Sequence, residues 1–416
     1  MKKFENIYCN RLKDFFNQSL RIWMREYQLI LSDVGVLIII LAVPVIYPFL
    51  YSLIYYPEVV RDLPVAVTDL SNSSDSRTFI RKLDATPELN VTCHCTSMNE
   101  AIRLFKERKV KGIVQIPKDF GEGLATKRPV VVSAYADMEF FLYYKALMTG
   151  VNFVAIDMGK EIQCNNLINE GYSISQAEAI AEPLDIVDNA MSNRSGGFAS
   201  YGIPAALILI IQQTLVLAIG IMAGTARERH PYGSLVSLDI NRLGIFRQII
   251  GKSAAYFSIY AILCIYMLGL IPQLFGYEHR ADLMSLISLV TPFLLSSIFF
   301  GMSLSVLFRS RESAMMLYLF SSIPLLFLSG IIWPLSNFDG IWLLLRQAFP
   351  SSNAMIGFIK MNSLGAGISE TRNEITALWI QAAVYLAIAC TAYGFQVKYA
   401  EHLTKNLEKR QYLHLR

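Results

Sequence analysis

The chain contains 416 residues, of which 54% are hydrophobic and 17% are charged, and its formal net charge is +4. Globular proteins carry about 25% charged residues, so this composition argues against a disordered chain, a collagen-like repeat and a secreted disulfide scaffold. It favours a membrane protein.

Residues 1–33 are predicted to form a cytoplasmic N-terminal segment with an amphipathic helix. Between residues 11 and 31, apolar side chains recur at helical spacing and polar side chains lie opposite them. The apolar face comprises Leu12, Phe16, Leu20, Trp23, Tyr27 and Ile30. Such a helix either lies in the membrane interface or packs against its own protein, and both interpretations stay open at this point.

Six stretches without any charged residue or histidine are long enough to cross about 30 Å of hydrocarbon. They cover residues 34–56, 203–224, 254–275, 283–308, 313–334 and 376–397. Because unsatisfied backbone groups are costly in lipid, such stretches predict transmembrane helices. The first stretch follows 33 residues and is too long for a cleaved signal peptide, so we expect it to remain as an anchor.

The orientation follows from the Lys and Arg residues of the short loops, which concentrate on the cytoplasmic side. Segments 1–33, 225–253, 309–312 and 398–416 hold 18 of these residues, whereas 276–282 and 335–375 hold 4. Both termini are therefore predicted to be cytoplasmic. The net charge of +4 reflects this bias, and we expect no nucleic-acid partner.

Residues 57–202 are predicted to form an external α/β domain with a helical return to the second span. Strand-like runs cover 64–68, 89–93, 112–116 and 130–134, and helical runs cover 73–84 and 98–109. Alternation of strands and helices predicts a small α/β unit. The predicted fold class is thus an α-helical polytopic membrane protein with six transmembrane helices, one before and five after an inserted extracytoplasmic α/β domain.

Three cysteines fall in this external domain. In an oxidising compartment Cys93 or Cys95 could form a disulfide with Cys164. The run Cys93-His94-Cys95 does not have the ligand spacing of a structural zinc site, so we expect no metal site. A disulfide and free thiols both stay open.

Enzyme motifs are not found. The run Gly251-Lys252-Ser253 invites comparison with a Walker A loop, but position 246 is Phe where that loop needs Gly. HExxH, GxSxG and kinase signatures are absent from the sequence. The chain is therefore predicted not to be an enzyme and to hold no cofactor.

Two further features bear on transport. Residues 335–375 contain an apolar core, 341–359, interrupted by Arg346 and Pro350, which predicts a re-entrant or interfacial hairpin on the external side. The spans themselves contain glutamines, Gln212, Gln213 and Gln381, but no ionisable residue. The lack of ionisable residues argues against coupling to protons or ions.

Several short motifs lie in a consistent order along this topology. Residues 226–235 read ARERHPYGSL, and Gly251-Lys252 follows before the third span; residues 112–120 read GIVQIPKDF; residues 328–334 read LSGIIWP and precede Phe349-Pro350. Together they resemble the "RE … GT-x-E", "GK", "IP-x-x-F" and "SG-x-x-x-P … P" motifs in permease subunits of bacterial ABC-2-type exporters. Gly233-Ser234 stands where that family has Gly-Thr, and Val236 where it has an acidic residue.

The resemblance implies a permease of the bacterial inner membrane that has no nucleotide site and works with a separate ABC ATPase subunit, which uses ATP and Mg²⁺. It also implies a dimer with a second copy or a paralogue, contact with membrane lipid, and an optional periplasmic adaptor and outer-membrane channel. The cytoplasmic loop 225–253 would contact the ATPase. The residues implied for this coupling are Arg227, Glu228, Arg229, His230, Gly233, Gly251 and Lys252. Those implied for the translocation path or its gate are Gln212, Gln213, Gly330, Pro334, Phe349 and Pro350.

The expected function is export of a hydrophobic or amphipathic compound from the cytoplasm or the inner membrane. The alternative is a membrane receptor or sensor, or a phage-type receptor, that binds its ligand through residues 57–202. Five further spans and the lack of a signalling domain favour the exporter. An intramembrane enzyme is disfavoured because the spans contain no Ser/His, Asp/Asp or metal-ligand set.

Overall fold

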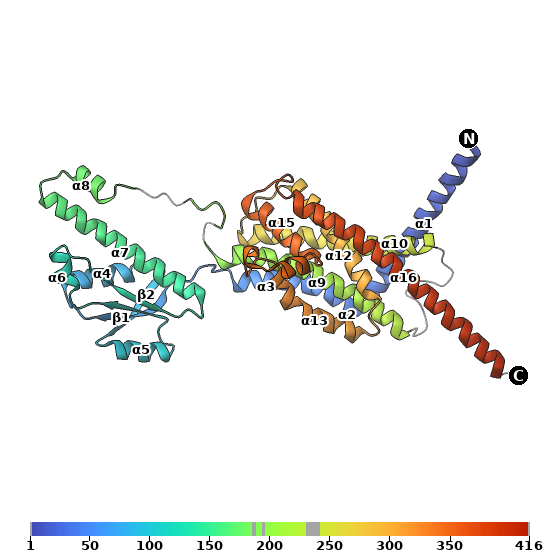
Figure 1. Ribbon diagram of the computed structural model, residues 1–416, viewed down its shortest axis with the longest axis horizontal. Helices are drawn as coiled ribbons and strands as arrows, with labels where there is room; N and C mark the ends of the chain where they lie inside the picture. Colours follow the sequence, from blue (N-terminus) through green and yellow to red (C-terminus); the bar gives the residue numbers. More distant parts are fainter. Residues whose placement is uncertain (1, 185–188, 194–195, 230–241, 415–416) are drawn as a thin grey trace. The chain divides into compact units, whose positions relative to one another are not determined.

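The computed structural model describes residues 2–184, 189–193, 196–229 and 242–414. Its contacts divide the chain into two compact units (Figure 1). Met1–Tyr56 and Met191–Arg416 form one of them, which we call the helical unit. Pro57–Ala190 form the other, which we call the sheet unit.

The helical unit consists of helices of very different lengths. They are α1 (Lys2–Ser32), α2 (Val34–Leu37), η1 (Ile38–Ala42), α3 (Val43–Ile54), α9 (Phe198–Arg229), α10 (Arg242–Cys264), η2 (Ile265–Leu270), α11 (Ile271–Phe275), α12 (Leu283–Ser305), α13 (Arg311–Leu328), η3 (Leu335–Asn337), α14 (Gly340–Arg346), α15 (Pro350–Leu364) and α16 (Arg372–His414).

Within the described residues, five helical segments are long and apolar enough to cross a membrane. They are Val34–Ile54, Gly202–Arg229, Gly244–Phe275, Leu283–Ser305 and Arg372–Ala400. The prediction of a polytopic helical membrane protein is confirmed at this level. Each segment overlaps one of the six predicted spans.

The structure differs at the predicted span 313–334. Helix α13 begins with the charged residues Arg311 and Glu312 and ends at Leu328. It cannot continue smoothly because Gly330 has a φ of +85°, a conformation that an α-helix does not use. Apolar composition alone did not reveal this break, because residues 329–334 are themselves mostly apolar.

Helix α9 forms the centre of the helical unit. In the most apolar 18-residue stretch of α9, 83% of the residues are buried. In the corresponding stretch of Val34–Ile54, 22% are buried. Helices α3, α12, α13 and α15 all contact it. A helix that is apolar all round belongs in such an interior position, so the burial of α9 places its neighbours.

The sheet unit is built on a four-stranded sheet in the order β2-β1-β3-β4. Strand β1 is parallel to β2 and β3, and β4 is antiparallel to β3. Helices α4 and α7 cover one face and α5 covers the other (Figure 1). The elements are β1 (Leu63–Asp69), α4 (Ser74–Asp84), β2 (Leu89–Cys95), α5 (Met98–Lys106), β3 (Gly112–Ile116), α6 (Phe120–Ala125), β4 (Ser133–Ala136), α7 (Phe141–Asn169) and α8 (Ile174–Ala181).

Side-chain alternation explains the two faces of the sheet. In β1, Val65 and Val67 point toward α4 and α7, whereas Ala66 packs with α5. This is the period of two that a strand covered on both sides requires. The fourth strand begins at Ser133 rather than at the expected residue 130.

In the segment 335–375, a tight turn joins helices α14 and α15. Helix α14 ends at Arg346 and α15 begins at Pro350, which are the two positions where the sequence analysis expected interruptions. Most residues of α15 are buried. Proline at the first position of a helix loses no hydrogen bond, because that amide has no partner within the helix.

A tight contact between α9 and the start of α13 gives a first prediction. A Cβ atom on Gly224 would lie 2.6 Å from the carbonyl carbon of Ser310, and this backbone cannot move aside easily. We expect Gly224→Ala to cost about 1–3 kcal/mol of stability through overpacking and to lower the melting temperature in detergent.

Gly269→Ala is the matched control, because a Cβ atom at Gly269 would meet nothing within 4 Å. It should leave the melting temperature unchanged or raise it slightly, since alanine favours helix. Equal melting temperatures for the two variants would contradict the tight packing.

Candidate functional site

Two of the predicted coupling residues hold the turn between α12 and α13. The Arg227 Nη2 atom donates a hydrogen bond of 2.7 Å to the carbonyl oxygen of Val306, which follows the last residue of α12. The Glu228 Oε1 atom accepts one of 2.8 Å from the backbone amide of Arg311, the first residue of α13. Both bonds satisfy groups that a helix end leaves without a partner.

The other residues of this charged segment are placed differently. Arg229, the last residue of α9, is exposed. His230 and Gly233 lie outside the described residues. Among the described coupling residues, Glu228 and Arg229 are both exposed, and Glu228 already accepts the bond from Arg311.

A forked ion pair joins the beginnings of α2 and α13. The Arg311 Nη1 and Nη2 atoms lie 3.0 Å and 2.9 Å from the two carboxylate oxygens of Asp33. The Asp33 side chain also accepts a hydrogen bond from the amide of Val36 and so caps α2. Burial acts to raise the pKa of Asp33, but the hydrogen bonds from Arg311 and Val36 outweigh it and lower this pKa.

Gly251 and Lys252 lie inside α10. The sequence had predicted instead that they belong to a cytoplasmic loop, 225–253. A Cβ atom on Gly251 would come within 2.8 Å of the Ile22 side chain of α1, so glycine lets the two helices approach closely. The Lys252 Nζ atom lies 3.7 Å from a carboxylate oxygen of Glu26, and the hydroxyl of Tyr256 donates to the other oxygen at 3.3 Å. These residues fasten α1 to α10.

The pair of Lys252 and Glu26 also corrects the prediction that the spans contain no charged residue. The apolar helical segment Gly244–Phe275 includes Lys252, whereas the predicted span began at residue 254. The buried carboxylate of Glu26 is its partner. The absence of charge that we inferred from the sequence therefore holds for 254–275 but not for the whole helix.

The predicted glutamines carry hydrogen bonds to broken parts of the unit. The Gln212 Oε1 atom accepts a bond of 2.6 Å from the amide of Ser351 at the start of α15. Gln381 of α16 donates one of 2.6 Å to the carbonyl oxygen of Gln347, and Tyr385 donates to Ala348. The turn between α14 and α15 is thereby held between α9 and α16.

The remaining residues predicted for the path pack in the same region or end a helix. Gln213 donates a bond of 3.2 Å to the hydroxyl of Ser321 on α13. Phe349 packs edge-on against Phe300, with ring centroids 5.9 Å apart, and Pro350 is buried. Gly330 ends α13, and Pro334 immediately precedes η3. The predicted path residues thus anchor the hairpin and the helix break.

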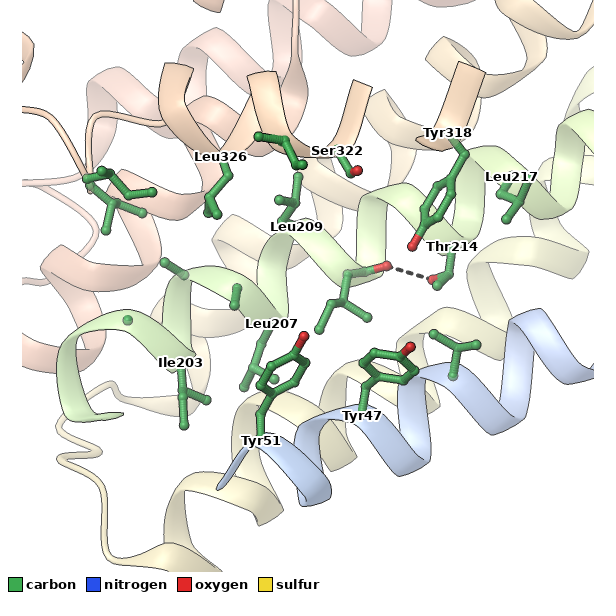
Figure 2. Close-up of a pocket in the computed structure, with 18 of the residues that line it drawn as sticks. Tyr47, Tyr51, Ile203, Leu207, Leu209, Thr214, Leu217, Tyr318, Ser322 and Leu326 are labelled. Carbon is green, nitrogen blue, oxygen red and sulfur yellow. Dashed lines mark hydrogen bonds between the residues drawn. The ribbon is translucent and has the colours of Figure 1, made fainter. Parts of the chain in front are cut away.

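An apolar cavity of the helical unit lies between α3, α9 and α13 (Figure 2). Its volume is about 530 Å³, which is in the size range of small-molecule sites. No charged side chain of the described residues lines it. Figure 2 shows the rings of Tyr47 and Tyr51 from α3 and of Tyr318 from α13 around the cavity.

The polar groups of this cavity are hydroxyls. Tyr47 and Tyr51 of α3 and Tyr55, which directly follows this helix, are spaced four residues apart, so they lie on one side of it. Thr214 also lines the cavity, although its hydroxyl already donates to the carbonyl oxygen of Ile210 at 2.7 Å. The cavity can accept an apolar molecule that carries a few neutral hydrogen-bonding groups.

These tyrosines are not among the residues predicted from the sequence. The residues predicted for the path do not line this cavity. The interval of four between Tyr47, Tyr51 and Tyr55 was the available signal, but tyrosine is ordinary near a membrane interface. Only the approach of Tyr318 from α13 makes the row part of a cavity.

The cysteines of the sheet unit are free thiols. Cys95 and Cys93 pack with α5 on one face of the sheet, whereas Cys164 belongs to α7, which covers the opposite face. The structure therefore does not support the disulfide that the sequence left open. No group of three metal-binding side chains occurs within the described ranges.

The forked pair gives a second prediction. Asp33→Asn removes the charge from the ion pair that joins α2 to α13, and we expect a loss of about 1.5–3 kcal/mol, measured as a lower melting temperature at pH 7. Combining Asp33→Arg with Arg311→Asp should restore part of the loss, because the pair is reversed but kept.

The same pair predicts a pH dependence. The pKa of Asp33 is lower in the folded protein than its unfolded value of about 3.9, so the pair stabilises the fold above that pH and loses its effect as the pH falls further. The difference between wild type and Asp33→Asn should be constant from pH 5 to 8 and shrink below about pH 4. A difference that disappears already at pH 6 would contradict this assignment.

Comparison with known proteins agrees with the helical architecture. No curated protein gives a significant match to the chain. A family model described as "ABC-2 family transporter protein" matches residues 34–391. This match runs from the first apolar segment into α16 and covers most of the chain, including the hairpin and the cavity. The chain belongs to the ABC-2 family of transporter proteins.

Proposed function

We propose that this chain is the permease subunit of an ABC-type exporter that moves a hydrophobic or amphipathic compound out of the cytoplasm or the inner membrane. The observation that carries the proposal is the tyrosine-lined cavity of about 530 Å³ in a member of a transporter family. An uncharged lining suits an apolar molecule better than an ion, because a charged group would lack compensation there.

The membrane arrangement is part of this proposal. Helix α13 would serve as a sixth crossing beside the five candidate segments, since exposed apolar side chains such as Leu319, Phe320 and Ile323 extend along it. The distribution of Lys and Arg would place both termini in the cytoplasm. The sheet unit would then lie outside, where it could meet a periplasmic adaptor.

A separate ABC ATPase would supply the energy. The described ends of α9 and α10 border residues 230–241, which would form the contact surface together with Arg229. Arg227 and Glu228 would pass a movement of α9 to the turn between α12 and α13, because both side chains bind that turn. A second copy or a paralogue would complete the transporter.

The cavity is tested by filling it. Ala206 lines the cavity and is only partly buried, so Ala206→Phe should narrow the cavity without forcing the core apart. The variant is reconstituted in proteoliposomes together with the ABC ATPase encoded next to it. We expect ATP-driven transport of an apolar fluorescent dye to be at least ten-fold slower than in the wild type.

Ile262→Phe is the control, because Ile262 is 68% exposed on α10 and does not line the cavity. It should transport at the wild-type rate. If Ala206→Phe transports at the wild-type rate and has the wild-type melting temperature, the cavity is not part of the transport path.

The coupling role is tested with two variants of the charged segment. Arg227→Ala with Glu228→Ala removes both bonds to the turn, and we expect it to lower the melting temperature and to abolish transport. Arg229→Ala should leave the melting temperature unchanged but weaken co-purification with the ATPase. If transport and ATPase activity survive all three substitutions, coupling does not run through this segment.

A further inference from the structure

The sheet unit contains a second cavity that the transport proposal does not use. It is a groove of about 800 Å³ between α4 and the ends of β1 and β2. These two strands are parallel, and the groove includes Asp69 at the carboxyl end of β1 and Cys95 at that of β2. Thr68 of β1 pairs with Cys95 of β2, so the carboxyl ends of the two strands meet at one edge of the sheet, and the groove lies there.

Basic side chains dominate the charge of this groove. Arg77 and Arg81 of α4 and His94 of β2 line it. The arginines are one helical turn apart, and like charges at this spacing repel one another. Such a pair is stabilised when an anion lies between or beside the two side chains.

The protein itself does not supply that anion among the residues that the structure describes. Each arginine makes one hydrogen bond to a neutral group: the Arg77 Nη1 atom donates to the carbonyl oxygen of Asn72 at 3.0 Å, and the Arg81 Nη2 atom to the hydroxyl of Thr78 at 3.1 Å. A guanidinium has five N–H donors, so most remain available. By contrast, the neighbouring Lys82 lies 2.7 Å from Asp157 and 2.6 Å from Glu161.

The one carboxylate in the lining has other partners. Asp69 accepts hydrogen bonds of 3.0 Å from the amides of Ser71 and Asn72 and one of 2.7 Å from the hydroxyl of Ser76. Its role is to shape the loop after β1. In that loop Asn72 adopts a φ of +51°, and its carbonyl oxygen accepts the bond from Arg77, which lines the groove.

We propose that this groove binds a small molecule that carries a phosphate group, with Arg77 and Arg81 holding the phosphate oxygens. Arginine matches phosphate geometry through paired, charge-assisted bonds. The hydroxyls of Thr78 and Thr96 and the apolar side chain of Val67 also line the groove and would contact the rest of the molecule. A soluble phosphorylated compound and a lipid headgroup share this chemistry.

The full-length protein in phosphatidylcholine nanodiscs is titrated with inorganic pyrophosphate, and the ionic strength is kept constant with chloride. Hydrogen exchange is followed in peptides that cover residues 72–81 and 92–96. We expect protection of both peptides, with an apparent affinity at least ten-fold weaker in the double variant Arg77→Gln, Arg81→Gln.

The matched control is Arg103→Gln with Lys106→Gln. It removes the same charge from α5, on the opposite face of the sheet, and should leave the affinity unchanged. A second set of nanodiscs contains phosphatidylglycerol. If the two peptides are protected in these nanodiscs without pyrophosphate, the phosphate group comes from a lipid headgroup. If they are not protected there, it comes from a soluble compound. Lack of protection under both conditions, or equal weakening in both double variants, would overturn the proposal.

Discussion

Polar groups that lie among apolar side chains must find partners inside the protein, and the broken parts of the helical unit depend on this constraint. Two turns and the helix ends beside them lie next to α9, and side chains of α9 or α16 form hydrogen bonds with each turn. Arg227 and Glu228 bind the turn between α12 and α13, and Gln212 with Gln381 binds the turn between α14 and α15. In a low-dielectric environment an unmade bond of this kind is expensive. The same polar side chains therefore decide where the short helices lie.

The residues that resemble the family's motifs therefore have a structural role, because they connect helices. Gly251 allows α1 to approach α10, and Lys252 pairs with Glu26 across that contact. A movement that an ATPase imposes near the end of α9 or α10 would reach α1, α12 and α13 through these few side chains. In the proposed function, the charged segment and the Gly-Lys pair would be parts of this connection, and Arg229 would contact the ATPase.

Much of the helical architecture could be predicted from the sequence, because long apolar stretches have one solution in lipid. The positions of the turn at Arg346 and Pro350 could also be predicted, since a charge and a proline mark it. The end of α13 at Leu328 could not, because residues 329–334 are apolar and the break depends on the conformation of Gly330. The cavity was missed for a similar reason: Tyr318 is far from Tyr47 and Tyr51 in sequence, and only the packing of α3 and α13 on α9 brings it to them.

The central claim is that the tyrosine-lined cavity is part of the transport path. The most direct measurement uses an apolar photoreactive compound that the reconstituted transporter itself moves, followed by mass-spectrometric location of the adducts. We expect adducts on residues of α3, α9 and α13 that line the cavity, such as Tyr51 and Tyr318, and the loss of these adducts in Ala206→Phe. Adducts confined to other helices while transport continues would contradict it.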